Sequence, residues 1–295
     1  MVPVVTDDGT DFLVPFLIDA GAVRGRLVRL GPALESILAP HDYPAPVALL
    51  LAQALTLAAA LAGSLKFDGV LTLQIQSDGP VSLIVADATS GGDLRGYARH
   101  DPVRLSEDAA LGKGFLAFTI DQGPETDRYQ GIVELAGDGL EACAQRYFQQ
   151  SEQLETAFRL AARPGEGGWQ AAALMIQRMP TGPSSPILTA DEAAEAWNRA
   201  RILLHSARDE EMLDLAPERL LYRLYHADGL RPADLRRLQA GCRCSAERVA
   251  MTLKSFPRQE LDDLRDADGR VDVVCEFCKA QYLFSEADLD RLYLS

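Results

Sequence analysis

Four cysteines near the C-terminal end constrain this chain more than any other feature of its 295 residues. They form two close pairs, Cys242-Arg-Cys244 and, some thirty residues later, Cys275-Glu-Phe-Cys278. A segment of about 55 residues rarely holds together through apolar burial alone, and a structural metal commonly supplies the missing stability. We therefore predict a small C-terminal domain, residues 241–295, built around a metal site.

The ligand set of this site predicts zinc. Four thiolates in two close pairs suit tetrahedral Zn²⁺. We see no secretory leader in the sequence, which favours metal or redox chemistry over a framework of structural disulfides. One zinc ion per chain is expected in the reduced protein, bound by Cys242, Cys244, Cys275 and Cys278. Three basic residues close in sequence would partly offset the thiolate charge: Arg243, Arg248 and Lys279.

The net charge argues against two classes of partner. Aspartate plus glutamate number 43 against 29 for lysine plus arginine, which gives a formal charge of −14 at pH 7. A protein that follows nucleic-acid phosphates needs a basic face, and an anionic membrane surface repels an acidic chain. We expect neither nucleic acid nor membrane among the partners.

One apolar segment has the length of a membrane span. Residues 47–65 contain no charged side chain, which meets the length criterion. Seven of these residues are alanine, polar Gln53, Thr56 and Ser64 interrupt the segment, and no aromatic belt or basic flank frames it. This composition favours a helix buried on most sides in a protein core.

Alternating sequences around this helix predict strands. Leu71, Leu73 and Ile75 point one way in an extended chain while polar residues between them point the other, and a turn at 78–80 precedes a second alternating run. Further strands are expected within 12–29, 94–99, 114–120, 129–135 and 169–179, and a helix at 140–150. This order of elements predicts an α+β body over residues 1–179 that folds without the rest.

The next segment has the composition of a linker followed by helices. Residues 180–186 hold three prolines, a glycine and two serines. Thr189 and Glu192 then form a capping box, and apolar residues repeat at helical spacing among many charged ones. We predict that residues 180–240 form a helical, amphipathic linker whose apolar face docks on another part of the protein.

Separated motifs in this order resemble a known family. Cys242-Arg-Cys244 and Cys275-Glu-Phe-Cys278, with Tyr282 and Phe284 after them, resemble the zinc-binding domain of the 33 kDa chaperonin family, redox-regulated bacterial heat-shock chaperones. Three further stretches are similar to motifs of that family's N-terminal body: Leu73-Gln-Ile-Gln-Ser-Asp-Gly-Pro80, Tyr129-Gln-Gly-Ile-Val133 and Tyr147-Phe-Gln-Gln-Ser-Glu-Gln153. The loop before Tyr129 and the residue Glu155 depart from the family pattern at surface positions.

The resemblance implies a holdase and not an enzyme. Family members hold zinc through four thiolates when reduced and are then largely inactive. Oxidation by peroxide or hypochlorite under unfolding stress is implied to join Cys242 to Cys244 and Cys275 to Cys278, release zinc and unfold the linker. The active form is expected in the bacterial cytoplasm, where it binds unfolding client proteins without ATP, associates into homodimers and later passes clients to an ATP-dependent foldase system.

Physical chemistry alone supports part of this expectation. Zn–S bonds of about 2.3 Å place neighbouring sulfurs roughly 3.8 Å apart, and a disulfide needs about 2.05 Å, so a short movement converts each pair. Structural zinc contributes on the order of 10–16 kcal/mol to folding a small domain, whereas a disulfide that closes a tiny loop contributes much less. Oxidation is therefore expected to unfold the terminal unit.

Two other classes of function fit parts of the sequence. A zinc-ribbon module that binds protein or nucleic acid would favour a basic C-terminal unit, yet residues 241–295 hold 11 acids against eight bases. A thiol–disulfide oxidoreductase using Cys275 and Cys278 would need a thioredoxin-like βαβ setting. The preceding Gly269-Arg-Val-Asp-Val-Val instead predicts a hairpin strand, which suits a zinc site.

The remaining chemistry-bearing residues form no recognisable site. Cys143 lies on an apolar helical face, which predicts a buried thiol. The four histidines are scattered: His41, His100, His205 and His226. No Walker A pattern and no Gly-x-Ser-x-Gly elbow occurs, so neither ATP chemistry nor acyl transfer is expected.

Overall fold

The computed structural model describes residues 10–63, 68–106, 110–123, 126–135, 139–180 and 188–294. Contacts between residues divide the chain into two compact units, residues 1–240 and 241–295. Each unit is described by itself below.

Two six-stranded sheets build the first unit. The first sheet has the order β10-β1-β2-β9-β8, with β11 paired to β1: β1 (Phe12–Ile18), β2 (Val23–Leu30), β8 (Thr156–Gly165), β9 (Gly168–Arg178), β10 (Arg231–Pro232) and β11 (Arg236–Arg237). The second sheet has the order β12-β5-β4-β3-β6-β7: β3 (Val70–Ser77), β4 (Val81–Thr89), β5 (Asp93–His100), β6 (Gly114–Asp121), β7 (Tyr129–Leu135) and β12 (Gln239–Ala240). All described pairings are antiparallel except that of β12 with β5.

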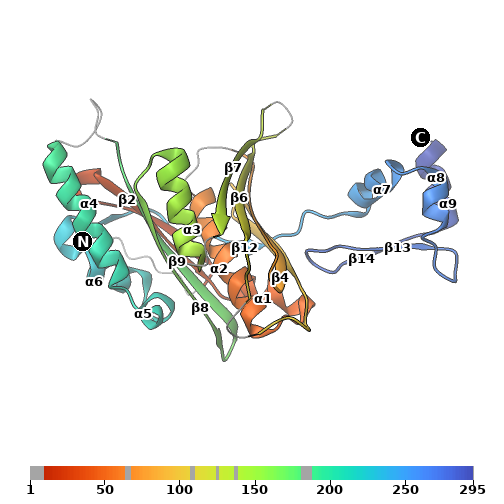
Figure 1. The fold of residues 1–295 in the computed structure, drawn as a ribbon, viewed down its shortest axis with the longest axis horizontal. Helices are drawn as coiled ribbons and strands as arrows, with labels where there is room; N and C mark the ends of the chain where they lie inside the picture. The colour runs from red at the N-terminus through yellow and green to blue at the C-terminus, as the bar shows by residue number, and fades with distance from the viewer. Residues whose placement is uncertain are drawn as a thin grey trace. The chain divides into compact units, whose positions relative to one another are not determined.

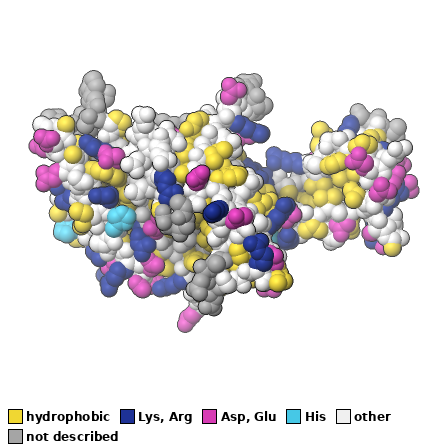
Figure 2. Space-filling model, in the orientation of Figure 1, with side chains coloured by type: hydrophobic (Ala, Val, Ile, Leu, Met, Phe, Trp, Pro, Cys, Tyr) yellow, Lys and Arg dark blue, Asp and Glu magenta, His cyan; other side chains and the backbone are white. Residues whose placement is uncertain are grey.

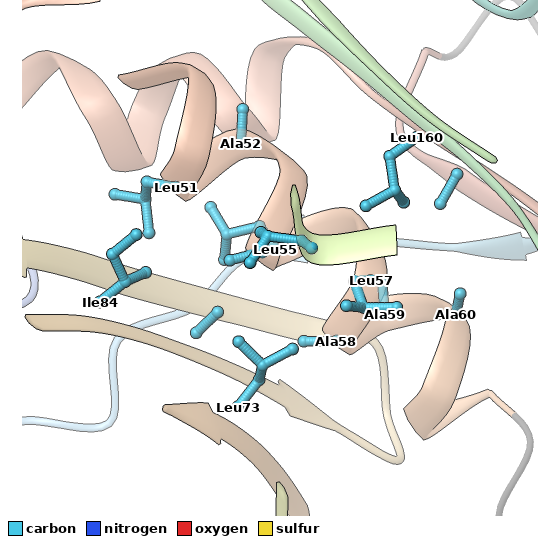
Figure 3. Close-up of a cluster of buried hydrophobic side chains, with 14 of the residues drawn as sticks. Leu51, Ala52, Leu55, Leu57, Ala58, Ala59, Ala60, Leu73, Ile84 and Leu160 are labelled. Carbon is cyan, nitrogen blue, oxygen red and sulfur yellow. The ribbon is translucent and has the colours of Figure 1, made fainter. Parts of the chain in front are cut away.

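Helices fill the space between the two sheets, as Figure 1 shows. They are α1 (Pro32–Leu38), α2 (Ala45–Ala62) and α3 (Gly139–Tyr147), the last continued by a π-helical turn, Phe148–Glu152. Leu51, Leu55 and Ala58 of α2 lie with Ile84 and Leu73 of the second sheet (Figure 3). The mixed sheet-and-helix architecture confirms the α+β class.

The long apolar helix is a core element. Among the described residues, α2 alone has the length and apolar composition to cross a membrane, but 72% of that window is buried. Thr56 is fully buried, and its hydroxyl donates to the carbonyl oxygens of Ala52 and Gln53 at 3.2 and 3.0 Å. The predicted buried helix is therefore confirmed, and its central polar side chain is satisfied within the helix.

A second helical layer covers the other face of the first sheet. It consists of α4 (Ala190–His205), α5 (Asp209–Asp214) and α6 (Pro217–Tyr225), followed by a 3₁₀ turn, His226–Asp228. The predicted capping box is present, since Thr189 Oγ1 accepts from the Glu192 N–H at 3.2 Å and Glu192 Oε2 accepts from the Thr189 N–H at 2.7 Å. The predicted docking of an amphipathic layer on the body is thus seen in the structure.

The sequence prediction is wrong at the C-terminal end of this layer and untested at its N-terminal end. Residues 229–240 are not helical, because Gly229 adopts a positive φ of 63° and the chain then runs extended as β10, β11 and β12. These short strands pair with the edges of β1 and β5, which supply the partners for their backbone groups. Within the expected linker 180–186, positions 181–186 lie outside the described residues.

Two elements of the body also differ from the prediction. β8 was not foreseen, because its sequence mixes arginines and alanines without clear alternation. The helix expected at 140–150 ends as an α-helix at Tyr147, and its last turn is widened to a π-helix up to Glu152.

The second unit is small and has a small core. It contains α7 (Ala246–Lys254), α8 (Arg258–Asp262), a hairpin of β13 (Val271–Val274) and β14 (Gln281–Phe284), and α9 (Glu286–Leu294). Its fully buried apolar residues are Leu253, Leu261, Val271, Phe284 and Leu289. A core of this size contributes little stability, which is the physical reason to expect a metal here.

Candidate metal and redox centre

The four predicted cysteines meet in the second unit. Cys242 and Cys244 lie in the extended segment before α7, whereas Cys275 and Cys278 lie in the turn between β13 and β14. The Cys275 N–H donates to the Ala280 carbonyl and the Lys279 N–H donates to the Cys275 carbonyl, both at 2.9 Å. Lys279 takes the left-handed φ of 58° that this tight turn requires. The turn aims both sulfurs of the second pair at the first pair.

The distances between sulfurs match a single tetrahedral site. Cys242 Sγ lies 3.3 Å from Cys244 Sγ and 3.8 Å from Cys275 Sγ, and Cys244 Sγ lies 3.4 Å from Cys278 Sγ. All four sulfurs lie within 4.8 Å of one another. A tetrahedron of Zn–S bonds of about 2.3 Å has edges of roughly 3.8 Å, so the donor set and its size fit Zn²⁺.

The thiolate form of this cluster needs a nearby cation. Burial raises the pKa of the Cys278 thiol to about 12, and hydrogen bonds with the other three thiols add to this effect. Four thiolates so close together would repel one another strongly in the absence of a positive ion. The thiolate form that binds metal is therefore stable here only when a cation shares the site.

A tyrosine hydroxyl completes the surroundings of the sulfurs. Tyr282 of β14 donates its hydroxyl hydrogen to Cys244 Sγ at 3.1 Å. This hydrogen bond is the main reason that the pKa of Tyr282 rises to about 12. Hydrogen bonds to ligand atoms orient the ligands of metal sites. The sequence analysis quoted Tyr282 only as part of a motif and did not assign it a contact.

The basic residues near the cluster bind oxygen atoms. Arg248 Nη1 donates to the Arg243 carbonyl at 2.8 Å, and Lys279 Nζ lies 3.5 Å from Glu276 Oε2. These contacts are to oxygen atoms and not to sulfur, so the expected offset of thiolate charge by Arg248 and Lys279 stays a prediction. Ser245 caps α7 by accepting from the Arg248 N–H, which places the start of this helix next to Cys244 in the chain.

The fifth cysteine stays apart from the cluster. Cys143 is 2% exposed in α3, where it belongs to the core of the first unit. This confirms the prediction of a buried thiol. The pair Cys275–Cys278 follows a strand and closes a hairpin, and the motif does not open a helix as it would in a thioredoxin-like oxidoreductase.

The apolar interface under the helical layer is the second feature with functional meaning. The Phe16 ring packs over Gly25, and a Cβ added at Gly25 would lie 2.0 Å from this ring. Phe16 also stacks on the fully buried Tyr225 of α6, with 5.6 Å between the ring centroids. Trp197 of α4 is 6% exposed on the same interface. The sheet side of this interface contributes a continuous set of buried apolar residues: Phe12, Val14, Phe16, Ile18, Val23, Leu27, Ala157, Ala161, Ala172, Leu174 and Ile176.

Polar contacts tie the helical layer to the sheet. Arg29 of β2 donates to the carbonyls of Met212 and Leu215 at 2.6 Å, and Arg199 of α4 pairs with Asp19 at 2.9 Å. The outer side of the layer is different, because acidic and basic side chains lie interspersed on the face that Figure 2 shows. A layer with a charged outside and an apolar inside hides most of the sheet face from solvent.

Comparison with known proteins agrees with this arrangement. A sequence model of the family described as Hsp33 protein matches residues 11–285. A 33 kDa chaperonin of Caulobacter vibrioides is 39% identical over 304 residues, covering 96% of this chain and 98% of the relative. A 33 kDa chaperonin of Ectopseudomonas mendocina is 40% identical and covers 96% and 95%. The crystal structure of a 33 kDa chaperonin from Thermotoga maritima has a TM-score of 0.81 at 23% identity, covering 96% of this chain and 98% of that one.

Proposed function

The chain belongs to the Hsp33 protein family, and from this premise we propose that it is a redox-regulated, ATP-independent holdase. Membership supports a chaperone function and therefore the binding of client proteins. The observation that carries the finer proposal is the cluster of four sulfurs within 4.8 Å in a unit with almost no core of its own. The unit's fold then depends on the redox state of its cysteines.

In the reduced protein, Cys242, Cys244, Cys275 and Cys278 would hold one zinc ion. The ion supplies folding free energy to the second unit, on the order of 10–16 kcal/mol for small zinc domains. Tyr282 orients Cys244, and the tight turn at Lys279 positions the second pair. The helical layer keeps the apolar sheet face covered, so the reduced form is inactive.

Oxidation would pair the thiols as Cys242–Cys244 and Cys275–Cys278. Each pair of thiolates gives up two electrons as its S–S bond forms, and one hydrogen peroxide takes up these electrons with two protons from solvent and becomes two waters. The pairs then no longer offer thiolates, and the zinc leaves. The second unit loses its largest source of stability, because the new disulfides close only very small loops.

Loss of the second unit would loosen the residues that precede it. The helical layer has little stability apart from its docking on the sheet. Its departure would uncover the apolar face of β1, β2, β8 and β9 for unfolding clients. We propose residues 1–179 as the chaperone body, 180–240 as the switch and 241–295 as the redox sensor. Homodimer formation on oxidation, transfer of clients to ATP-dependent foldases and action in the bacterial cytoplasm belong to the same proposal.

The test measures metal, thiols and chaperone activity together. Zinc content, thiol titre and suppression of aggregation of a heat-denatured client are followed before and after peroxide. We expect one zinc and five thiols per chain before oxidation, then loss of four thiols and of the zinc as activity appears. The variant Cys275→Ser should bind zinc weakly and leave the second unit partly unfolded without oxidant, whereas Cys143→Ala should behave as the parent. Activity that appears with all zinc retained would contradict the proposal.

A further inference from the structure

A cavity in the first unit is not used by the redox mechanism. It has a volume of about 410 Å³ and lies where the end of α2 meets both sheets. Its apolar wall includes Leu61, Leu71, Phe118, Ile120 and Phe148. Cavities of about 300–1,000 Å³ with mostly apolar walls and a few fixed polar groups are typical sites for small molecules.

Two motifs from the sequence analysis meet at this cavity. Tyr129 comes from the first, and Tyr147, Phe148 and Glu152 come from the second. Gly131 of the first motif gives room for the Tyr147 ring, because a Cβ there would lie 2.1 Å from Tyr147 Cε2. Neither motif takes part in the cysteine cluster or in the interface under the helical layer, so both are left without a role in the redox switch.

The acidic group of the cavity already has hydrogen-bond donors. Glu152 Oε1 accepts from the hydroxyls of Tyr129 and Tyr147, each at 2.6 Å. These hydrogen bonds help to raise the pKa of both tyrosines, so both hydroxyls remain donors at neutral pH. The carboxylate charge is thus stabilised within the protein and does not call for a ligand.

Two arginines of β2, Arg24 and Arg26, have no acidic partner among the described residues. Arg24 lines the cavity and donates from Nε to Gln177 Oε1 at 2.7 Å, while Gln177 Nε2 donates to Thr156 Oγ1 at 3.0 Å. This buried amide holds the guanidinium in place but is neutral. Arg26, two residues along the same face of β2, is 7% exposed, and its Nε and Nη1 have no hydrogen-bond partner. Neither arginine has an ion-pair partner among the residues that the structure describes.

Burying a guanidinium without an ion-pair partner costs folding free energy, and a second guanidinium nearby raises this cost. Burial and the charges of Arg24 and Arg236 lower the pKa of Arg26 to about 9. In a chain with 43 acidic residues, most of the described arginines that are partly buried do have carboxylate partners, as Arg95, Arg159 and Arg178 do. An anion at this cavity would give Arg24 the charged partner that the described residues do not provide.

We propose that the cavity binds a small amphipathic carboxylate. Its charged end lies at Arg24, which shares one face of β2 with Arg26, and its apolar body occupies the part lined by Leu61, Leu71 and Phe118. The proposal is independent of the redox switch, because none of these residues belongs to the cysteine cluster or to the interface under the helical layer.

Calorimetric titration of the reduced full-length protein with octanoate, below its micellar concentration, tests this proposal. Octanol and octyltrimethylammonium serve as neutral and cationic probes of similar length. We expect octanoate to bind at least about tenfold more tightly than either, because hydrogen bonds to charged groups contribute this much. The variant Arg24→Gln should lose this advantage for octanoate and leave octanol binding unchanged. Arg201→Gln, at an exposed position on α4, removes the same charge and should change nothing.

A second variant separates binding from folding. Arg26→Leu removes an unpaired buried charge, so its melting temperature without ligand should equal or exceed that of the parent, while the rise in melting temperature with octanoate should be lost. Equal binding of octanoate and octanol, or unchanged octanoate binding in Arg24→Gln, would overturn the proposal. If octyltrimethylammonium binds more tightly than octanoate, and Glu152→Gln abolishes this binding, the cavity is a cation site and the proposal is overturned.

Discussion

At the scale of single residues, the proposed metal centre includes more than its four sulfurs. Tyr282 donates to Cys244 Sγ, and this contact both orients the ligand and lowers the charge density on it. We predict that Tyr282→Phe weakens zinc affinity by about 10- to 100-fold, the usual effect of losing a partner of a metal ligand. Competition with a chromophoric chelator measures this change.

The same variant should respond faster to oxidant. A thiolate that loses a hydrogen-bond donor and holds its metal less firmly is more available to peroxide. Tyr293→Phe offers the matched control, since the Tyr293 hydroxyl donates to the Phe256 carbonyl at 2.7 Å in the same unit and not to sulfur. Equal zinc affinity of Tyr282→Phe and the parent would show that the hydroxyl contact has no role in the site.

At the scale of elements, the helical layer depends for its stability on packing against the sheet. Helices as short as α5 and α6 do not persist alone in water, and their apolar side chains are buried against the sheet. In a Trp169→Phe background, oxidation should therefore shift the emission of Trp197 to the red and raise amide exchange across residues 189–240. Fluorescence and hydrogen exchange by mass spectrometry give the two readouts.

The two halves of this segment allow an internal comparison. Residues 190–228 are helical, whereas 231–240 pair with the edges of both sheets. If exchange rises only after residue 229 in protein that has become an active holdase, the helices stay docked and the client surface lies elsewhere. Unchanged exchange throughout would place the gate outside this segment.

At the scale of the whole molecule, the structure bears on where the chaperone body ends. The helical layer and the strands β10–β12 belong to the compact unit 1–240. A fragment of residues 1–240 keeps the layer but lacks the second unit, so it should melt cooperatively at a temperature below that of the reduced parent. A fragment of residues 1–179 should still fold around α2, but its bare sheet face should lower its melting temperature by more than about 5 °C, since each 1 kcal/mol lost shifts the midpoint by about 2–4 °C at this size.

The shorter fragment should also act without oxidant. Its exposed apolar face should cause self-association and suppress client aggregation under reducing conditions, as light scattering would show. Residues 1–240 should show both effects more weakly, because the layer is still present but the second unit that biases it is gone. A fragment 1–179 that is monomeric and inactive would argue against the sheet face as the client surface.

The sequence alone was enough to predict the chemistry that we propose for this protein. Ligand identity depends on residue type and spacing along the chain, so the Cys-x-Cys and Cys-x-x-Cys pairs were sufficient to predict a metal centre. Local patterns also sufficed for α2, whose uncharged alanine-rich sequence indicates burial, and for the start of α4, whose capping box needs only Thr189 and Glu192. These signals are short-range and do not depend on what lies across the fold.

Only the tertiary structure decided how distant parts meet. Residues 231–240 are extended because β1 and β5 offer free edges, and no local pattern records the presence of an edge. The hydroxyl of Tyr282 reaches Cys244, 38 positions earlier in the chain, because the hairpin folds back on the first cysteine pair. Arg24 and Arg26 look like ordinary surface residues in the sequence, but the fold places Arg24 on the wall of a cavity and buries Arg26 without a partner for its Nε and Nη1. Such contacts join residues far apart in the chain, so their energies appear only once the chain has folded.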